Sequence, residues 1–465
     1  MVKLGAANAG RPGQGWQRAL AGLDGLPVNR FHWRLVFLSG LGWMFDGMDT
    51  ILLALVLPAL ALAWGLSPTQ VGLVGTVDRL GALCGAALAG PLADRYGRRA
   101  LFQATLLVYS LGTGLLASAA NLTSFLLIRF FVGIGLGGEL PVVATLITEM
   151  APVKRRGQLV AVLSSFWSYG WFLAALVGFL IIPTLGWRTA FLVGALPALY
   201  VFVLRRTVPE SPRYLIATGQ QKQAMEVLRG MGVKEESLGS GSIASLDSHP
   251  PQSSVKLLFA RPYLRRTILL WILWFCLFFT FYGIFIWLPS LLLARGLGLV
   301  RSLEYILLMS LAQVPGYFLA GYLADRVGRR WSFVALMLLS AISAGIFGIS
   351  AQPAEVLFWG VLLNFFNAGA YALAYAYTPE GYGTGVRAAG TGWATAFGRA
   401  GAAIAPLTVG LLLEFLPGAQ GQALVFYLMV GFFILAAISM AVLAVETKDK
   451  SLESLAETTE DHGSG

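Results

Sequence analysis

Charged side chains are scarce in this sequence of 465 residues, of which Asp, Glu, Lys and Arg make up only 12%. An ordinary soluble domain holds about twice that share. Hydrophobic residues make up 57% of the chain and aromatic residues 12%. So few charges would not cover the cores of a soluble chain of this length, and a disordered chain would hold far fewer apolar residues. The composition therefore indicates a membrane protein that crosses the bilayer several times.

Cysteine and histidine are also rare, with two and three residues respectively. Cys84 and Cys276 both fall in apolar runs, so the sequence contains neither a disulfide framework nor a cysteine spacing typical of a metal site. His32, His249 and His462 lie outside those runs. No nucleophile elbow or phosphate-binding loop occurs either. We therefore expect no metal and no cofactor, and we do not expect an enzyme.

Apolar runs of about 20 residues, long enough to cross about 30 Å of hydrocarbon, begin at twelve places. The first six begin near 35, 68, 100, 122, 157 and 187, and the second six near 266, 301, 331, 353, 386 and 422. The sequence thus predicts an all-α membrane protein with twelve transmembrane helices in two six-helix bundles. We place the boundaries at 1–34 for an N-terminal segment, 35–205 for the first bundle, 206–265 for a central loop with short helices, 266–445 for the second bundle and 446–465 for a tail.

The basic residues are unevenly distributed about these spans. Of the 33 Lys and Arg residues, 27 lie on the side that holds both termini and the central loop. Loops rich in Lys and Arg stay in the cytoplasm. We therefore expect both termini and the central loop to lie in the cytoplasm. The net charge of +10 then needs no nucleic-acid partner, because topology accounts for it.

A ten-residue motif occurs twice in the chain. GPLADRYGRR at 90–99 and GYLADRVGRR at 321–330 match at eight positions and lie 231 residues apart. Two charged pairs that follow the fourth and tenth spans repeat at the same offset, Glu149 with Arg156 and Glu380 with Arg387. Two unrelated signals at one offset indicate a duplicated six-helix unit.

The doubled G-x-x-x-D-R-x-G-R-R loop, the two sets of six spans and the central loop resemble the major facilitator superfamily over nearly the whole chain. PESPRYL (209–215) and ETKDKSLESL (446–455) are similar to the sugar-porter and organic-ion-porter signatures. Segments similar to bacterial nicotinate and organic-acid porters, which are related to synaptic-vesicle and organic-anion transporters, lie at 26–50, 133–152 and 281–292. The resemblance implies a secondary transporter of a bacterial-type inner membrane, expected as a monomer, whose two bundles rock around a midplane site.

Charges cluster in and near the doubled loop, on the predicted cytoplasmic side. We interpret them as a gate that joins the two bundles while the opposite side is open and that breaks when this side opens. The alternative is that they only fix the topology, since exposed ion pairs contribute about 0–1 kcal/mol. The gate candidates are Asp94, Arg95, Arg98, Glu149, Arg156, Asp325, Arg326, Arg329, Glu380 and Arg387.

Ionisable residues inside spans are functional candidates, because each costs about 2.5–3.5 kcal/mol on insertion scales. By the resemblance, Asp49 in a G-x-D pattern and Arg129 in an R-x-x-x-G-x-G pattern match sugar porters that use protons. The implied cycle pairs Asp49 with Arg129 in one state and protonates and releases it in another. A static buried ion pair is the alternative. Asp46 and Glu139, expected at similar depth, are further candidates as proton sites or substrate ligands.

Asp78 and Arg79, in the second span, depart from the small apolar residues usual there in relatives. Adjacent residues diverge by about 100° on a helix, so we do not expect these two to pair with each other. The sequence assigns them no role.

Arg399 is the first candidate for substrate binding. Its run, FGRAGAAIAP at 397–406, resembles organic-anion porters, in which an arginine at this place attracts the substrate anion. The alternative is that Arg399 neutralises Glu414 or a helix C-terminus. Further candidates for substrate contact inside the spans are Tyr282, Asn367, Tyr371, Tyr375, Gln313, Trp171 and Thr395.

Glycines repeat in the fourth span as Gly133-x-Gly135-x-x-Gly138. This spacing fits a dinucleotide-binding pattern, but it lies in the middle of a span with no strand before it. We therefore interpret the run as a surface for close helix packing.

Together these features predict proton-coupled symport of a small organic anion by alternating access. Aromatic monocarboxylates such as nicotinate or benzoates are the favoured substrates. Sugar or organic-cation transport, diffusion without protons, and a non-transporting receptor or scaffold with the same fold are the alternatives. The expected partners are the carboxylate, protons and the lipid bilayer.

Overall fold

The computed structural model of the chain describes residues 26–152, 155–233, 255–382 and 386–447. Their regular secondary structure is helical, without a strand. The helices of the first half are α2 (Arg30–Trp64), α3 (Pro68–Tyr96), α4 (Arg98–Leu116), α5 (Leu122–Met150), α6 (Arg156–Gly194) and α7 (Pro197–Thr207). Short helices follow as α8 (Pro212–Ala217), α9 (Gln221–Met231) and α10 (Val255–Leu258). The second half holds α11 (Arg261–Phe285), α12 (Leu288–Ala294), α13 (Leu299–Leu311), α14 (Gln313–Arg326), α15 (Arg329–Ile349), α16 (Pro353–Glu380), α17 (Arg387–Phe415) and α18 (Ala419–Leu443).

Ten stretches in the described residues are long and apolar enough to cross a membrane. One of them, Gln158–Thr207, has 50 residues, and a straight helix of that length would measure about 75 Å, more than twice the hydrocarbon core. Gly186, with φ 80° and ψ 171°, breaks this stretch into two spans. Helix α4, which packs along α5, supplies a further span of 19 residues. The twelve membrane helices predicted from the sequence are thus present.

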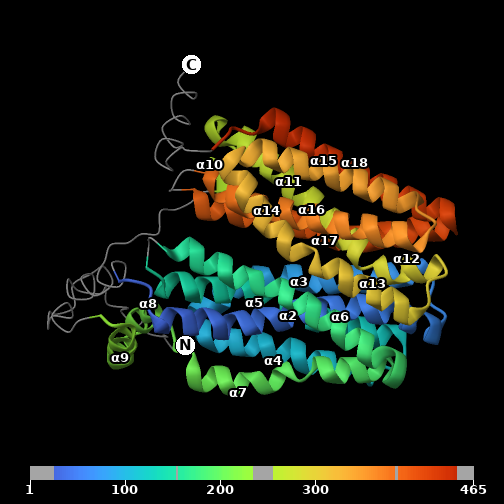
Figure 1. The fold of residues 1–465 in the computed structure, drawn as a ribbon. Coiled ribbons are helices and arrows are strands. Elements are labelled where there is room, and N and C mark those ends of the chain that lie inside the picture. Colours follow the sequence, from blue (N-terminus) through green and yellow to red (C-terminus); the bar gives the residue numbers. More distant parts are fainter. Residues whose placement is uncertain (1–25, 153–154, 234–254, 383–385, 448–465) are drawn as a thin grey trace, which may run out of the picture.

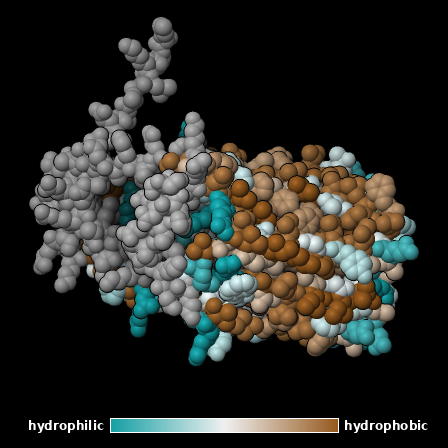
Figure 2. Space-filling view, turned by 90° about the horizontal axis from the view of Figure 1, so that it is seen from above, coloured by the Kyte–Doolittle hydropathy of each residue, from teal (hydrophilic) through white to brown (hydrophobic). Residues whose placement is uncertain are grey.

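The two halves lie side by side along the long axis of the molecule (Figure 1). Helices α8 and α9 lie at one end of the bundle, together with the first and last described residues, and we call this end the terminal face. The other end is the distal face. Figure 2 shows a broad apolar surface between more polar ends, as expected of a protein that faces lipid along its middle.

Helices α3 and α5 pack against each other with their backbones in close approach. A Cβ atom on Gly137 would lie 1.9 Å from the carbonyl oxygen of Ala82, and one on Gly133 would lie 2.3 Å from that of Asp78. Only glycine fits at these two places. The close packing predicted for the glycine run is therefore confirmed at Gly133, and Gly137 adds to it. The approach at Gly133 brings Asp78 next to α5.

Helices α3 and α17 join the two halves over the distal part of their length. Thr76 Oγ1 donates a hydrogen bond of 2.7 Å to the carbonyl oxygen of Ala403. Nearer the distal face, a Cβ on Gly72 would lie 2.5 Å from the carbonyl oxygen of Pro406. Contacts of α2 with α12 and of α6 with α13 also join the halves. The molecule is therefore closed at its distal face.

Candidate functional site

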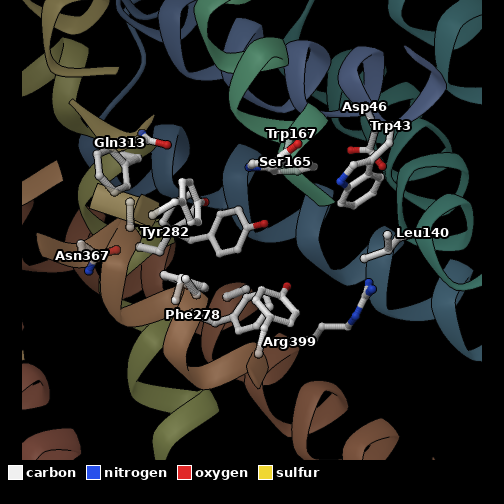
Figure 3. Close-up of a pocket in the computed structure, with 18 of the residues that line it drawn as sticks. Trp43, Asp46, Leu140, Ser165, Trp167, Phe278, Tyr282, Gln313, Asn367 and Arg399 are labelled. Atoms are coloured by element: carbon white, nitrogen blue, oxygen red, sulfur yellow. The ribbon is translucent and has the colours of Figure 1, made fainter. Parts of the chain in front are cut away.

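A cavity of about 710 Å³ lies between the two halves (Figure 3). Helices α2, α3, α5 and α6 form its wall on one side, and α11, α14, α16 and α17 form it on the other. The wall continues toward the terminal face, where it includes Val160 near the start of α6 and Pro379 near the end of α16. The cavity thus extends from the middle of the spans toward the terminal face.

Aromatic rings make up much of the wall. Phe278, Phe281 and Phe285 come from successive turns of α11, and their rings face the cavity beside tyrosines of α11 and α16. Of the substrate candidates predicted from the sequence, the wall includes Arg399, Tyr282, Asn367, Tyr371, Tyr375 and Gln313. Flat rings at this density suit a flat, aromatic ligand.

Two substrate candidates do not lie on the wall. The Trp171 ring lies behind it, with its centroid 5.3 Å from that of Phe281 and 4.9 Å from that of Phe285. Thr395 donates its hydroxyl to the carbonyl oxygen of Thr391 at 3.0 Å, which ties it to its own helix. Trp171 therefore supports the aromatic wall, and Thr395 has no contact with the cavity.

Three charged side chains line the cavity, Asp46, Arg79 and Arg399. Arg399 Nη1 donates to the carbonyl oxygen of Ala82 in the other half at 3.3 Å. Among the described residues no carboxylate lies within 4.0 Å of its guanidinium. Glu414 instead binds the start of α3, so Arg399 does not neutralise it. The guanidinium of Arg399 thus faces the cavity and forms no ion pair with a carboxylate in the part of the protein that the structure describes.

Four buried side chains next to the cavity form a continuous chain of ion pairs. Arg129 Nη1 lies 2.8 Å from Asp49 Oδ2, and Arg129 Nε lies 2.8 Å from Asp78 Oδ1. The other oxygen of Asp78 accepts a hydrogen bond from Arg79 Nε at 2.6 Å. The first three residues are completely buried, and Arg79 is 7% exposed. The order is therefore Asp49, Arg129, Asp78, Arg79, with charges that alternate in sign.

The expectation that Asp78 and Arg79 would not pair is wrong. Their Cα–Cβ bonds do diverge around α3, but the guanidinium has a long flexible arm that folds back to its neighbour. Burial of both charges makes this pairing necessary, because an isolated charge in a site without water is very costly. Helix α5 then places Arg129 against the second oxygen of Asp78.

The chain of ion pairs has a partner at each end. Thr113 of α4 donates its hydroxyl to Asp49. At the other end, the guanidinium carbon of Arg79 lies 4.7 Å from the centroid of the Tyr282 ring, which belongs to the second half. The chain thus connects the interior of the first half to a wall residue of the second.

Asp46 and Glu139 are buried at 2% and 0% exposure, and they influence each other electrostatically. Asp46 lines the cavity, whereas Glu139 does not. No cation among the described residues lies within ion-pair distance of Glu139. Apart from Glu139, the described site holds equal numbers of carboxylates and guanidiniums: the buried Asp46, Asp49 and Asp78 against the buried Arg79 and Arg129 and the half-buried Arg399.

Comparison with known proteins identifies the family. The chain matches the family described as "Sugar (and other) transporter" over residues 49–458. It belongs to that family.

Curated relatives of this transporter extend over most of its length. It is 42% identical over 437 residues to the niacin transporter NiaP of Acinetobacter baylyi, covering 93% of the chain and 98% of that relative. It is 30% identical over 403 residues to the benzoate transport protein of the same organism, covering 84% of the chain and 86% of the relative.

A solved structure shares the fold. The partially occluded inward open conformation of the xylose transporter XylE from E. coli superposes with a TM-score of 0.72 at 20% identity, covering 91% of this chain and 100% of that one. The major facilitator fold predicted from the sequence is therefore confirmed. The family match and the curated relatives make the protein a secondary transporter of that superfamily.

The charges predicted to form a gate lie at the terminal face of the transporter. Arg98 Nη2 lies 2.7 Å from Asp94 Oδ1 and 3.1 Å from Glu149 Oε1. In the second half, Arg329 Nε lies 3.6 Å from Glu380 Oε2. Each of these pairs lies within one half, and no ion pair between described residues joins the halves at this face. The gate interpretation assigns this arrangement to a state open at the terminal face.

The other predicted gate residues are Arg95, Arg156, Asp325, Arg326 and Arg387. Arg95 and Arg326 lie over the rings of Tyr96 and Tyr322. Asp325 is exposed. The side chains of Arg156 and Arg387 lie outside the described residues.

Two carboxylates that the sequence analysis did not single out hold the doubled loops. Glu210 Oε1 accepts the backbone N–H of the first residue of α4 at 3.0 Å, and Glu446 Oε1 accepts that of the first residue of α15 at 2.9 Å. Each caps a helix N-terminus. Gly97 and Gly328, with φ of 98° and 105°, leave room for them, since a Cβ there would lie 2.3 Å and 2.6 Å from these carboxylates. The two family signatures that contain Glu210 and Glu446 were the available signal.

Proposed function

We propose that this transporter carries a small organic anion of the aromatic monocarboxylate class, with nicotinate as the first candidate, and that a proton moves with it. The observation that carries the proposal is the guanidinium of Arg399, which faces an aromatic cavity and forms no ion pair with any carboxylate of the described ranges. A planar guanidinium binds a carboxylate through two parallel hydrogen bonds. The aromatic wall is suited to the ring of such a ligand.

The names of the relatives support the same class of substrate. Niacin and benzoate, for which two of them are named, are compact aromatic carboxylates. A sugar would leave the charge of Arg399 without a partner, and an organic cation would be repelled by it. We therefore favour an anion over both alternatives, and transport over a receptor or scaffold role.

The charge balance of the buried site supports proton coupling. We take Glu139 as neutral, because it is buried without a cation among the described residues. The other three carboxylates then match three guanidiniums, so an arriving anion adds one uncompensated negative charge in a poorly solvated site. Uptake of one proton by a carboxylate restores the balance. We propose Asp49 as the group that takes the proton, because it is buried and pairs with Arg129. Asp46 and Glu139 are the second choices.

The basic residues orient the molecule. We propose that the terminal face lies in the cytoplasm of a bacterial inner membrane, since the doubled motif ends there in two arginines each time, Arg98 with Arg99 and Arg329 with Arg330. We propose that the unit of function is the monomer, because the cavity is built by one chain.

Uptake by the purified protein in liposomes tests the proposal. An inward pH gradient should drive accumulation of labelled nicotinate, and benzoate should compete. D-xylose and tetraethylammonium, which represent the sugar and cation alternatives, should not compete. Competition by either one instead of benzoate would contradict the anion assignment. Uptake that equilibrates nicotinate without accumulation under the gradient would contradict proton coupling.

A further inference from the structure

We infer that Asp78 and Arg79 couple the two binding events, because they connect the substrate cavity to the proposed proton site at Asp49. This inference rests on the proposed function. It assigns a positioning role to two residues that the sequence analysis left without one. The predicted mechanism used only Asp49, Arg129 and Arg399.

The geometry gives Arg79 a unique position among the four linked side chains. Arg79 lines the cavity, whereas Asp49, Arg129 and Asp78 do not. The carboxylate of a ligand in the cavity is therefore able to contact Arg79 without reaching the three buried residues behind it. Arg79 also lies against Tyr282, a wall residue of the second half. A ligand bound at this wall therefore lies next to Arg79.

Asp78 lies between the two arginines in the line of ion pairs. One oxygen binds Arg79 and the other binds Arg129, so the carboxylate is shared by two guanidiniums. Arg129 is in turn shared by Asp78 and Asp49. Any event that takes Arg79 away from Asp78 leaves two carboxylates on one guanidinium.

The charged and titratable groups around these four linked residues come from several helices. Tyr109 of α4 and Glu139 of α5 are buried beside Asp46, and Tyr109 also faces Asp49. Asp49 faces Arg129 of α5 and Asp78 of α3, and Asp46 lies one turn before it on α2. On the cavity side, Tyr282 of α11 and Arg399 of α17 face Arg79 and Asp46. Asp46 faces both Arg79 and Arg399, and Arg79 acts on it more strongly. The four linked residues contain two carboxylates and two guanidiniums, so their charges balance in number.

The sequence of events follows from these contacts. The carboxylate of the substrate binds Arg399 and Arg79, and Arg79 loosens its bond to Asp78. Asp78 then depends on Arg129 alone and competes there with Asp49. Two carboxylates on one guanidinium carry one excess negative charge, which a proton on Asp49 removes. Substrate binding and proton binding thereby strengthen each other, as linkage requires.

Proton uptake on nicotinate binding tests the inference in the purified full-length protein. Titration calorimetry at several pH values, in buffers of different ionisation enthalpy, reports both the Kd and the number of protons taken up. Nicotinate keeps its carboxylate ionised throughout the range from pH 6 to 8. For the wild type we expect about one proton per nicotinate and a Kd that rises about tenfold per pH unit.

Two variants separate coupling from simple charge neutralisation. Asp78→Asn should still bind nicotinate through Arg399 and Arg79, but binding should take up no proton, and the Kd should vary less than about twofold per pH unit. The double variant Asp78→Asn/Arg79→Gln removes one charge of each sign and keeps the site balanced. If Asp78 only neutralised Arg79, this double variant would regain the proton uptake of the wild type. We expect it to remain without proton uptake.

Proton uptake in the double variant equal to that of the wild type overturns the inference. The proton would then bind a carboxylate other than those of the four linked residues, with Asp46 as the first candidate. The double variant also carries the test if Asp78→Asn alone does not yield folded protein, and thermal unfolding of each variant verifies the fold. Asp78→Glu, which keeps the carboxylate, should recover part of the proton uptake. If the wild type itself binds nicotinate without proton uptake, or does not bind it, the proposed function fails and not the inference alone.

Discussion

Glu414 of the second half caps helix α3 of the first half at Thr69. Its Oε2 accepts the backbone N–H of Thr69 at 2.9 Å and the hydroxyl of Ser67, the N-cap residue of α3, also at 2.9 Å. A carboxylate at a helix N-terminus satisfies free N–H groups and faces the positive end of the helix dipole. These bonds join the halves at the distal face, so a state open at that face has to break them.

Replacement of Glu414 by Ala should therefore favour the state that is open at the distal face. Distances between spin labels placed on the distal ends of α3 and α17 should show a larger population with long separations. Glu355→Ala is the matched control, because Glu355 is an exposed acid in the first turn of α16. Equal distance distributions for Glu414→Ala and the control would exclude a role of this cap in closure.

Gly137→Ala should destabilise the first half. Its Cβ would lie 1.9 Å from the carbonyl oxygen of Ala82, so α3 and α5 would have to separate. Overpacking of this kind costs about 1–3 kcal/mol. Thermal unfolding in detergent should show a lower midpoint. Gly431→Ala, in α18, provides the control, since a Cβ there meets nothing within 4 Å and alanine favours a helix. A midpoint for Gly137→Ala as high as that of Gly431→Ala would contradict the packing argument.

The sequence was sufficient for the fold because span length and charge are local signals. Twelve apolar runs were visible, and even the break at Gly186 was indicated by a span beginning near 187. The pairing of Asp49 with Arg129 was suggested by patterns shared with sugar porters, and the ion pair is present in the structure.

The orientation of side chains around each helix was not predictable from the sequence. A helix in lipid is apolar toward both the bilayer and the protein, so hydrophobicity does not reveal which face meets the cavity. Trp171 and Thr395 were misplaced for this reason. The pairing of Asp78 with Arg79 was missed because Cβ directions alone ignore how far a guanidinium arm reaches. The contact of Glu414 with Thr69 joins residues far apart in sequence, and no local pattern indicates it.

Substitution of Arg399 tests charge selection. Arg399→Ala should weaken nicotinate binding about 10- to 150-fold, the equivalent of about 1.5–3 kcal/mol for a hydrogen bond to a charged group. Arg399→Lys should recover only part of the affinity, because an ammonium lacks the planar fork. Calorimetric titration measures both. Nicotinamide, the uncharged amide, is the control ligand, and its binding should change little. An equal loss of affinity for both ligands would indicate a general disruption of the cavity.

Asp94→Asn tests the gate interpretation at the terminal face. Asp94 pairs with Arg98 in the present state, and the interpretation requires the network to join the halves when this face closes. An exposed ion pair stabilises the state that contains it by about 0–1 kcal/mol. Its loss from the closed state should therefore raise the population open at the terminal face by up to about fivefold. Spin-label distances across this face measure the shift. Glu226→Gln, an exposed acid on α9, is the control. Unchanged distances in Asp94→Asn would leave these charges with a role in topology alone.

Asp49→Asn separates proton-driven accumulation from substrate exchange. A proton that enters across 100 mV provides about 2.3 kcal/mol, and one unit of pH gradient adds about 1.4 kcal/mol. The sum of about 3.7 kcal/mol supports a substrate gradient of several hundredfold. Asn keeps the shape of Asp but stays neutral, as the protonated acid would be. The variant should therefore lose accumulation of nicotinate under a pH gradient.

Exchange of labelled for unlabelled nicotinate across the liposome membrane needs no net proton movement, so Asp49→Asn should retain at least part of it. The same two assays on Asp46→Asn and Glu139→Gln locate the proton if Asp49→Asn accumulates nicotinate like the wild type. Loss of exchange together with accumulation in Asp49→Asn would indicate that Asp49 holds the substrate or the fold, because its carboxylate also accepts the hydroxyl of Thr113 and pairs with Arg129. Loss of accumulation alone assigns the proton to Asp49, since exchange shows that the substrate still binds and that the two halves still alternate.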